Sequence, residues 1–230
     1  MLLAYGDLNL PTNVPANQYI LIKGEKASAS RGVGKNLNDY LDEWNPDSLR
    51  YALASILPEQ NDSEISEDEM IRRNNEELVA AWGNLVQRVF SQYINNFENL
   101  EFDFELNDVD KKIIDEGNDC FKKTGELIEK VELKSSLQSV MGYVNKINAY
   151  LNETEPWKVI KEDSTRATAI LHTSLTAIEA CASLFTPFMP TTSEIVKGAI
   201  EKNTNNNWSV NDIKKGAPLQ DIGHLFKKFD

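Results

Sequence analysis

The residues best suited to hold a phosphate group lie in one short loop near the start of the chain. Gly32, Gly34 and Lys35 have the composition of a phosphate-binding loop, in which glycines let the backbone approach the phosphates and the lysine offers positive charge. In such loops a Ser or Thr follows the lysine and binds magnesium, but here Asn36 follows Lys35. The loop alone therefore predicts no complete nucleotide site.

The histidines and cysteines predict neither a metal site nor a hydrolytic triad. The chain has two of each, His172, His224, Cys120 and Cys181, with no CxxC pair or other ligand spacing. Neither histidine stands beside a Ser or Cys in a nucleophile turn, and His172 lies beside an apolar stripe, which favours a packing role. We expect no metal in this chain, and two reduced, buried cysteines in a cytoplasmic protein.

Composition limits the classes of partner. The 230 residues include 24 Lys and Arg against 36 Asp and Glu, a net charge of −12. Sequence-independent affinity for phosphates comes from clustered cations, so we expect no generic nucleic-acid binding and no DNA partner. With 41% hydrophobic residues, no apolar run of about 20 and no basic N-terminal region, the chain is expected to be soluble, without a membrane partner or a targeting segment.

These residues are positioned by a mainly α-helical fold that follows a short strand and loop. The β-prone run is 18–22, and Gly24 supplies a turn after it. Later, apolar residues recur at steps of three and four behind capping residues, as expected of helices packed in a bundle. The expected helices are 47–57 after Asn45-Pro46, 66–97 from a capping box at Ser66, one from Asn107 through Phe121, 133–151, 164–185, and one from a capping box at Thr191 to about Lys202.

Three of the tryptophans and the apolar residues of the tail are assigned structural roles. Trp82 lies on the stripe of the long helix and is expected in the core, and Trp44 is also expected to pack. The tail from Asn203 is polar, and its apolar residues are expected to anchor it to the bundle. These anchors are Trp208, Leu219, Leu225 and Phe226.

An ordered series of motifs resembles one enzyme family. The stretch Lys26-Ala27-Ser28-Ala29-Ser30 resembles the KMSKS signature loop of class I aminoacyl-tRNA synthetases. The runs that follow it resemble methionyl-tRNA synthetases, and the series spans essentially the whole chain. They are Asn45-Pro46-Asp47-Ser48-Leu49-Arg50-Tyr51, Arg72-Arg73-Asn74-Asn75-Glu76-Glu77-Leu78, Trp82-Gly83-Asn84-Leu85-Val86-Gln87-Arg88, Glu155-Pro156-Trp157 and Leu225-Phe226-Lys227-Lys228.

The resemblance implies that Lys26, Ser28 and Ser30 belong to a loop that stabilises the transition state for forming methionyl-adenylate. Ala27 and Ala29 replace the methionine and the second lysine of the signature, so one phosphate-facing charge is missing. The family's HIGH motif has no counterpart among the 25 residues before the loop, which are fewer than the roughly 30 that a βαβ unit needs. We therefore expect the chain alone to be inactive in methionine activation. ATP and magnesium, and the missing catalytic domain as a partner, belong to the intact parent enzyme.

The same resemblance divides the chain into two parts. Residues 1–57 correspond to the C-terminal remnant of the catalytic region, with the KMSKS-like loop and a segment that contacts the tRNA stem. Residues 58–230 correspond to the helical anticodon-binding domain and its C-terminal tail.

In the family, an Asn and an Arg one helical turn apart, with a Trp from another helix, recognise the CAU anticodon of methionine tRNA, and these match Asn84, Arg88 and Trp157. Asn84 and Arg88 are four residues apart, hence on one helix face. An amide offers a donor and an acceptor to a base edge, and a guanidinium can bond to a base or stack on it. Trp157 follows Pro156 at an expected helix start, where its ring could stack on a splayed base.

Structural roles for the same residues remain open at the level of sequence. Asn84 could bond to a neighbouring backbone group, Arg88 could pair with a carboxylate, and Trp157 could pack between helices. The corresponding alternative function is a synthetase-derived helical module that binds proteins and has no role in tRNA recognition. Discrimination between methionine tRNA and a tRNA with an altered anticodon separates the two.

Overall fold

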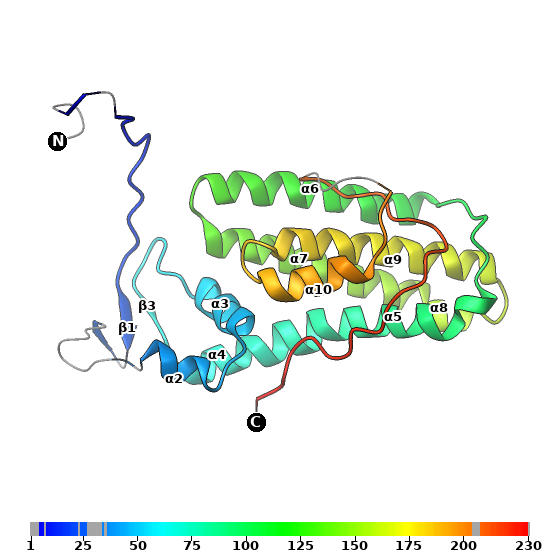
Figure 1. Ribbon diagram of the computed structural model, residues 1–230, viewed down its shortest axis with the longest axis horizontal. Coiled ribbons are helices and arrows are strands. Elements are labelled where there is room, and N and C mark those ends of the chain that lie inside the picture. Colours follow the sequence, from blue (N-terminus) through cyan, green and yellow to red (C-terminus); the bar gives the residue numbers. More distant parts are fainter. Residues whose placement is uncertain are drawn as a thin grey trace.

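A computed structural model describes residues 5, 6, 8–22, 24–26, 34, 36–203 and 208–229. It confirms a mainly α-helical fold with a short strand segment before it (Figure 1). The sheet lies at one end of an elongated helical bundle (Figure 1). Ser28 and Ser30 of the KMSKS-like loop lie outside the described residues.

The sheet has the order β2-β1-β3, with β1 Ile20–Ile22, β2 Glu25–Lys26 and β3 Ser63–Glu64. β1 confirms the β-prone run, and it pairs antiparallel with β2 through a turn in which Gly24 has a φ of +77°. β3 pairs parallel to β1 and was not expected, because Ser63 and Glu64 are two polar residues and carry no strand pattern. The sheet thus joins segments about 40 residues apart.

Two short helices lie between β2 and β3 in the sequence, α2 Leu37–Leu41 and α3 Pro46–Ser55. The start of α3 is as predicted: the side chain of Asn45 accepts a hydrogen bond from the backbone N–H of Asp47, and Pro46 occupies the first helical position. Arg50 links α3 to the turn that follows residue 185. Its guanidinium donates to the backbone carbonyls of Pro187 and Phe188 at 2.9 and 2.8 Å.

The predicted long helix runs through four segments: α4 Glu67–Arg73, the π-helical η2 Asn74–Gly83, α5 Asn84–Asn96 and the 3₁₀ turn η3 Phe97–Asn99. Ser66 caps α4, accepting from the N–H of Glu69 at 3.2 Å. The π-helical interior differs from the expected continuous α-helix, because apolar steps of three and four fit both forms.

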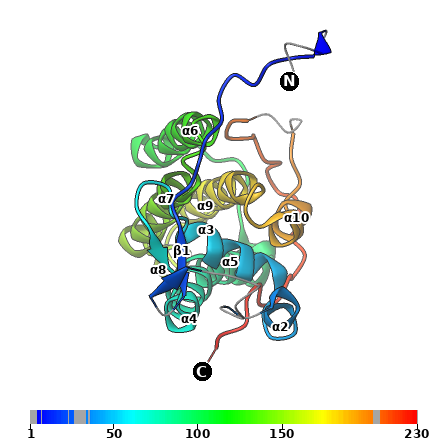
Figure 2. The same ribbon diagram turned by 90° about the vertical axis from the view of Figure 1, so that its left-hand side faces the viewer.

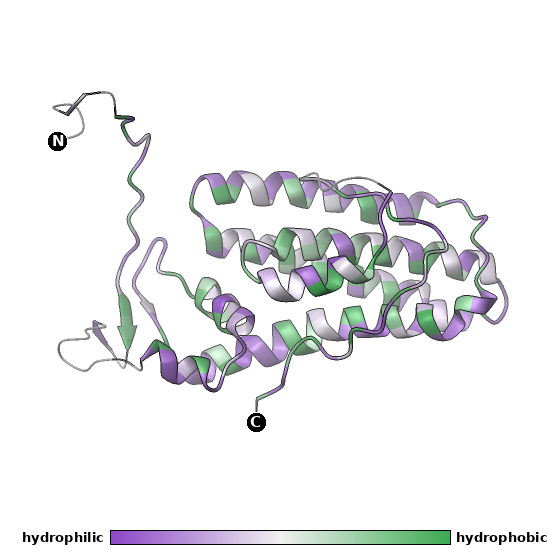
Figure 3. Cartoon of the chain, in the orientation of Figure 1, coloured by the Kyte–Doolittle hydropathy of each residue, from purple (hydrophilic) through white to green (hydrophobic). Residues whose placement is uncertain are grey.

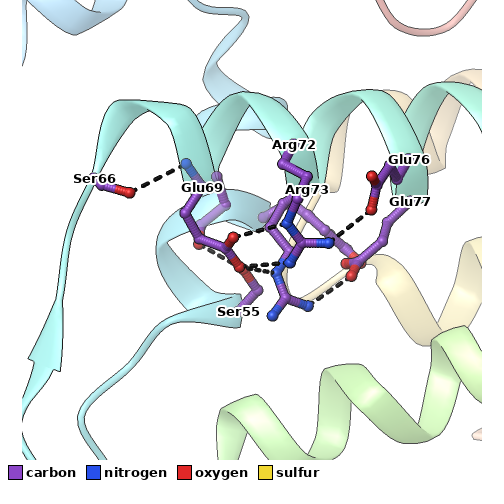
Figure 4. A network of polar contacts seen from close by, with 9 residues as sticks. Ser55, Ser66, Glu69, Arg72, Arg73, Glu76 and Glu77 are labelled. Carbon is purple, nitrogen blue, oxygen red and sulfur yellow. Dashed lines mark hydrogen bonds and ion pairs between the residues drawn. The ribbon is translucent and has the colours of Figure 1, made fainter.

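Charged residues around the end of α4 form the network in Figure 4. Arg72 pairs with Glu69 and Glu76, and Arg73 pairs with Glu69 and Glu77, at 2.6 to 2.8 Å. Hydrogen bonds from Arg72, then Arg73, lower the pKa of Glu69 to about 2. The side chain of Glu69 therefore serves two arginines rather than closing a reciprocal capping box with Ser66.

The bundle is completed by α6 Asp108–Glu129, α7 Leu133–Thr154, α8 Pro156–Val159, α9 Ser164–Phe185 and α10 Pro190–Ala199. Asn107 and Asp110 form a reciprocal capping box at the start of α6, as the sequence predicts for Asn107. In Figure 2, α9 lies centrally, with α6, α7, α10 and α5 around it. In Figure 3, α9 is mostly white to green, the colours of intermediate and hydrophobic residues, whereas α6 alternates between hydrophilic (purple) and hydrophobic (green) residues.

α9 is long and apolar enough to cross a membrane by length and composition, which corrects the expectation that the chain holds no such segment. Within the described structure, 94% of its most apolar window is buried. A helix surrounded by other helices is apolar on every side, so its position in the bundle accounts for its composition.

The predicted capping box at Thr191 is wrong. α10 begins at Pro190, which places Thr191 inside the first turn, and no side chain next to it in sequence caps the helix. Instead Asp47 of α3 accepts hydrogen bonds from the N–H and the hydroxyl of Thr192, at 2.6 and 2.9 Å. A carboxylate 145 residues away thus serves the N-terminus of α10.

The tail and the remaining structural expectations are confirmed. Phe226 is buried, Leu219 and Leu225 pack against the main core, and Trp208 donates its indole N–H to the carbonyl of Phe121 at 2.9 Å. Trp82 is buried in the main core, and Trp44 is buried in a smaller second core between α3 and α4. Cys120 and Cys181 are free and buried, and His172 packs against the ring of Phe104.

Candidate nucleic-acid interface

The fold brings Arg88 and Trp157 together although they are far apart in sequence. The guanidinium carbon of Arg88 in α5 lies 5.3 Å from the ring centroid of Trp157 in α8, within the distance of a cation–π interaction. Asn84 lies one turn before Arg88 at the start of α5, and both are exposed. All three predicted recognition residues therefore lie on described helices, and two of them are in contact.

The position of Trp157 follows from a sharp reversal between α7 and α8. Glu155 adopts a left-handed conformation with a φ of +43°, which ends α7 at Thr154. Pro156 then occupies the first position of α8, as the Glu-Pro-Trp sequence predicts. Left-handed backbone is unfavourable for a residue other than glycine, so the surrounding packing must hold it in place. As a result the half-buried Trp157 is directed toward α5.

The structural alternatives for Asn84 and Arg88 find no support among the residues that the structure describes. Within that part of the chain, no carboxylate pairs with Arg88, whose Nη2 donates instead to the side-chain oxygen of Asn152 at 3.1 Å. The side chain of Asn84 makes no hydrogen bond there, and it is exposed. Both side chains thus keep polar atoms available for another molecule.

A small apolar cavity of about 240 Å³ opens beside Arg88 and Trp157. Leu151, Pro156 and Leu171 contribute to its floor, and the polar residues Gln87, Ser91 and Gln92 of α5 border it. Gln87 donates to Ser91 at 3.4 Å. A pocket with apolar walls and a few amide groups is suited to a flat, polar-edged ligand.

Asn152, Gln87 and Gln92 were missed at the level of sequence. Their spacing carried a signal, because Gln87 lies three residues after Asn84 and Gln92 lies four after Arg88, on adjoining parts of one helix surface. Asn152 lies near the end of α7. Its spacing relates it to no predicted site residue, and only the contact with Arg88 identifies it.

Lys158, which follows Trp157, and Lys146 of α7 are both ion-paired. Lys158 forms an ion pair with Glu155 at 2.7 Å, and Lys146 pairs with Glu116 at 3.3 Å across α6 and α7. Arg88 is therefore the cation that the geometry places directly on the aromatic ring. Such an arrangement favours base stacking and edge hydrogen bonds over binding by charge alone.

Lys26 lies in β2, and its ammonium is 3.5 Å from the ring centroid of Tyr19. In Figure 1 the sheet that carries it lies at the opposite end of the molecule from the label of α8. Among the described residues, no group of three or more His, Cys, Asp or Glu side chains could hold a metal ion. Lys26 and the Arg88 site thus lie apart.

Two family models match the chain in succession. Residues 1–90 match "tRNA synthetases class I (M)", and residues 103–230 match the "Anticodon binding domain of methionyl tRNA ligase". The second match contains Trp157, whereas Asn84 and Arg88 lie near the end of the first.

Curated relatives point to the same family as the two family models. The chain is 38% identical to the methionine–tRNA ligase of Chloroflexus aggregans, over 81% of this chain and 31% of that protein. It is 37% identical to that of Roseiflexus castenholzii, over 100% of this chain and 44% of the relative. The chain thus spans less than half the length of these relatives.

Among solved structures, apo methionyl-tRNA synthetase of Mycobacterium tuberculosis superposes with a TM-score of 0.83 at 18% identity, over 99% of this chain and 46% of that one. The same enzyme in complex with methionyl-adenylate gives 0.80 at 20% identity, over 92% and 43%. These two likenesses establish the fold. With the matched models and the curated relatives, they show that the chain belongs to the methionyl-tRNA synthetase family.

Proposed function

We propose that this chain is the tRNA-binding part of a methionine–tRNA ligase, and that Asn84, Arg88 and Trp157 recognise the CAU anticodon of methionine tRNA. The observation that supports this most is the placement of the Arg88 guanidinium on the ring of Trp157, across two helices and beside an apolar cavity. A single-stranded loop is recognised through unstacked bases, which need an aromatic surface and polar groups beside it.

In this proposal each side chain has a distinct task. Trp157 offers a stacking surface, and the guanidinium of Arg88 bonds to the edge of the stacked base or to its neighbour. Asn84, one turn away, offers a donor and an acceptor to a second base. Asn152 of α7 holds the guanidinium of Arg88 in place before binding, so Arg88 loses less side-chain conformational entropy when the tRNA binds.

The proposal assigns residues 1–57 to the catalytic region and residues 58–230 to the anticodon-binding domain. Lys26, Ser28 and Ser30 would face the pyrophosphate of ATP in the complete cytoplasmic enzyme, with the catalytic domain as the partner of this chain. The described residues offer no ligand set for magnesium, so we derive no step through ATP or magnesium. We expect no methionine-dependent pyrophosphate exchange by the chain alone.

Titration with tRNA tests the proposal. Methionine tRNA should bind more tightly than the same tRNA with an altered anticodon. Trp157→Ala should weaken methionine tRNA binding by about 1 to 3 kcal/mol, or roughly five- to 150-fold, because one stacking surface is lost.

Trp208→Phe is the matched control, since Trp208 contacts Phe121 of α6 rather than the Arg88 site. It should leave tRNA binding unchanged. Equal affinity for both tRNAs would contradict the proposal and favour the protein-binding alternative. Pyrophosphate exchange by the chain alone would contradict the assignment of residues 1–57.

A further inference from the structure

The π-helical segment η2 affects which side of the long helix its buried residues face. Buried residues on this side of the long helix recur every four positions, at Met70, Asn74, Leu78 and Trp82. In an α-helix, four residues turn about 40° too far, so three such steps would carry the buried face about 120° around the helix. A π-helix has more residues per turn and rotates less per residue, so η2 offsets this drift and keeps the buried positions near one side of the helix.

The last π-type hydrogen bond ends at a recognition residue. The backbone N–H of Asn84 donates to the carbonyl of Val79, five residues earlier, as well as to that of Ala81. Asn84 and Arg88 follow directly, so the direction in which they face depends on how far η2 has turned. Gly83 fits this geometry, because an added Cβ would lie 3.0 Å from the carbonyl oxygen of Leu78.

The C-terminal tail contacts the first residues of η2 through side-chain amides. The amide of Asn75 pairs with the backbone of Phe229 in both directions: its Nδ2 donates to the carbonyl at 2.8 Å, and its Oδ1 accepts from the N–H at 3.0 Å. The neighbouring Asn74, which is fully buried, donates to the carbonyl of Lys227 at 2.9 Å. The ring of Phe229 packs on Trp44, with 4.3 Å between centroids.

The same tail also reaches the last residue of η2. Phe226 is buried, and a Cβ on Gly83 would lie 3.5 Å from its ring. In Figure 1 the red C-terminal segment runs alongside the cyan helix before it reaches the C-terminus. Residues 226–229 therefore contact both ends of the segment whose turning sets the phase of α5.

We propose that residues 226–229 position the anticodon-recognition residues, by holding η2 in its π-helical form so that Asn84 and Arg88 face Trp157. The proposal rests on the proposed function, which supplies the role of Arg88. It assigns to Asn74 and Asn75 the task of binding the tail, and to the tail the task of tuning tRNA selection from a distance.

The test uses two variants and one control. A chain ending at Phe226 loses the partners of Asn74 and Asn75 but keeps the contact at Gly83. Asn75→Asp is a milder change of similar shape, which can still accept from the N–H of Phe229 but cannot donate to its carbonyl. Lys228→Ala removes a tail charge at an exposed residue and leaves these contacts in place.

The first measurement needs no tRNA. The chain has four tryptophans, so its indole N–H resonances can be followed by NMR, with that of Trp157 assigned from Trp157→Phe. In both tail variants the Trp157 resonance should move toward its position in Arg88→Met, because the guanidinium has left the ring. It should stay in place in Lys228→Ala. An unmoved Trp157 resonance in folded tail variants would overturn the proposal.

The second measurement is the ratio of affinities for methionine tRNA and the altered tRNA. In the tail variants this ratio should fall by about tenfold, as expected when one base contact is lost, while Lys228→Ala weakens both affinities alike. A lower melting temperature with an unchanged ratio would show a purely structural tail and overturn the proposal. If the wild-type chain shows no preference, the proposed function fails, and the Trp157 resonance alone then decides whether the tail orients α5.

Discussion

His172 is expected to make the fold sensitive to mild acid. Its ring is 8% exposed and packs on Phe104, and burial lowers its pKa from 6.5 to about 4. The nearby ammonium of Lys215 acts in the same direction, whereas Asp212 opposes it. The folded chain thus keeps His172 neutral at a pH where an unfolded chain already binds a proton.

The sign and size of the effect follow from linkage. Between pH 6.5 and 4 the unfolded state binds more protons at this residue, so the free energy of unfolding falls as the pH falls. With pKa values of about 6.5 unfolded and about 4 folded, His172 removes about 2 kcal/mol of stability between pH 7 and pH 5, and about 3 kcal/mol by pH 4.

Urea unfolding of the wild-type chain and of His172→Phe at several pH values measures this contribution. Phenylalanine keeps a flat ring against Phe104 and removes the titration. The stability of the wild type relative to the variant should therefore fall by about 2 kcal/mol from pH 7 to pH 5. A difference between wild type and His172→Phe that is constant with pH would refute the reasoning.

Three further predictions test the packing of the bundle. Gly83→Ala should lower the melting temperature, because the added methyl would lie 3.0 Å from the backbone carbonyl oxygen of Leu78. Gly142→Ala is the control: it has open space around it and should stabilise α7 by about 1 kcal/mol. Equal effects of the two substitutions would contradict the π-helical geometry. Asp110→Asn should cost about 3 kcal/mol at pH 7 in chemical denaturation, because Arg166 loses a fully buried partner, and a loss below 1 kcal/mol would show the pair to be dispensable. Arg50→Lys should cost about 1 kcal/mol, because a single ammonium nitrogen lacks the planar fork whose Nε and Nη2 reach the two carbonyls of the α9–α10 turn, and wild-type stability would contradict that role.

Local sequence signals predicted most of the helical elements. Asn45 before Pro46, Ser66 before an acidic turn and Asn107 three residues before Asp110 each mark a helix start within one turn, because a cap acts on backbone groups of the same turn. The cap of α10 was predicted wrongly for the same reason. Its acceptor, Asp47, belongs to another helix, and no local pattern reports a contact across 145 residues.

The site was predictable in part. The spacing of Asn84 and Arg88 is enough to place them on one helix face in either an α- or a slightly wider helix. The approach of Arg88 to Trp157 depends on the left-handed turn at Glu155 and on the packing of α5 and α8 against α9, neither of which leaves a periodic signal. The resemblance to a family supplied that pairing, and the structure then gave the distance between Arg88 and Trp157.

The two regions that different family models match share contacts that resist relative motion. Asp47, 2% exposed, satisfies the N-terminus of α10, so moving α3 away from the bundle would leave a carboxylate and a helix end without partners in a poorly solvated place. At the other end of the chain, Phe229 closes the small core around Trp44. Because α3 and the tail both hold the start of the long helix, we expect α3 and α5 to keep a fixed separation, rather than to move about a flexible linker.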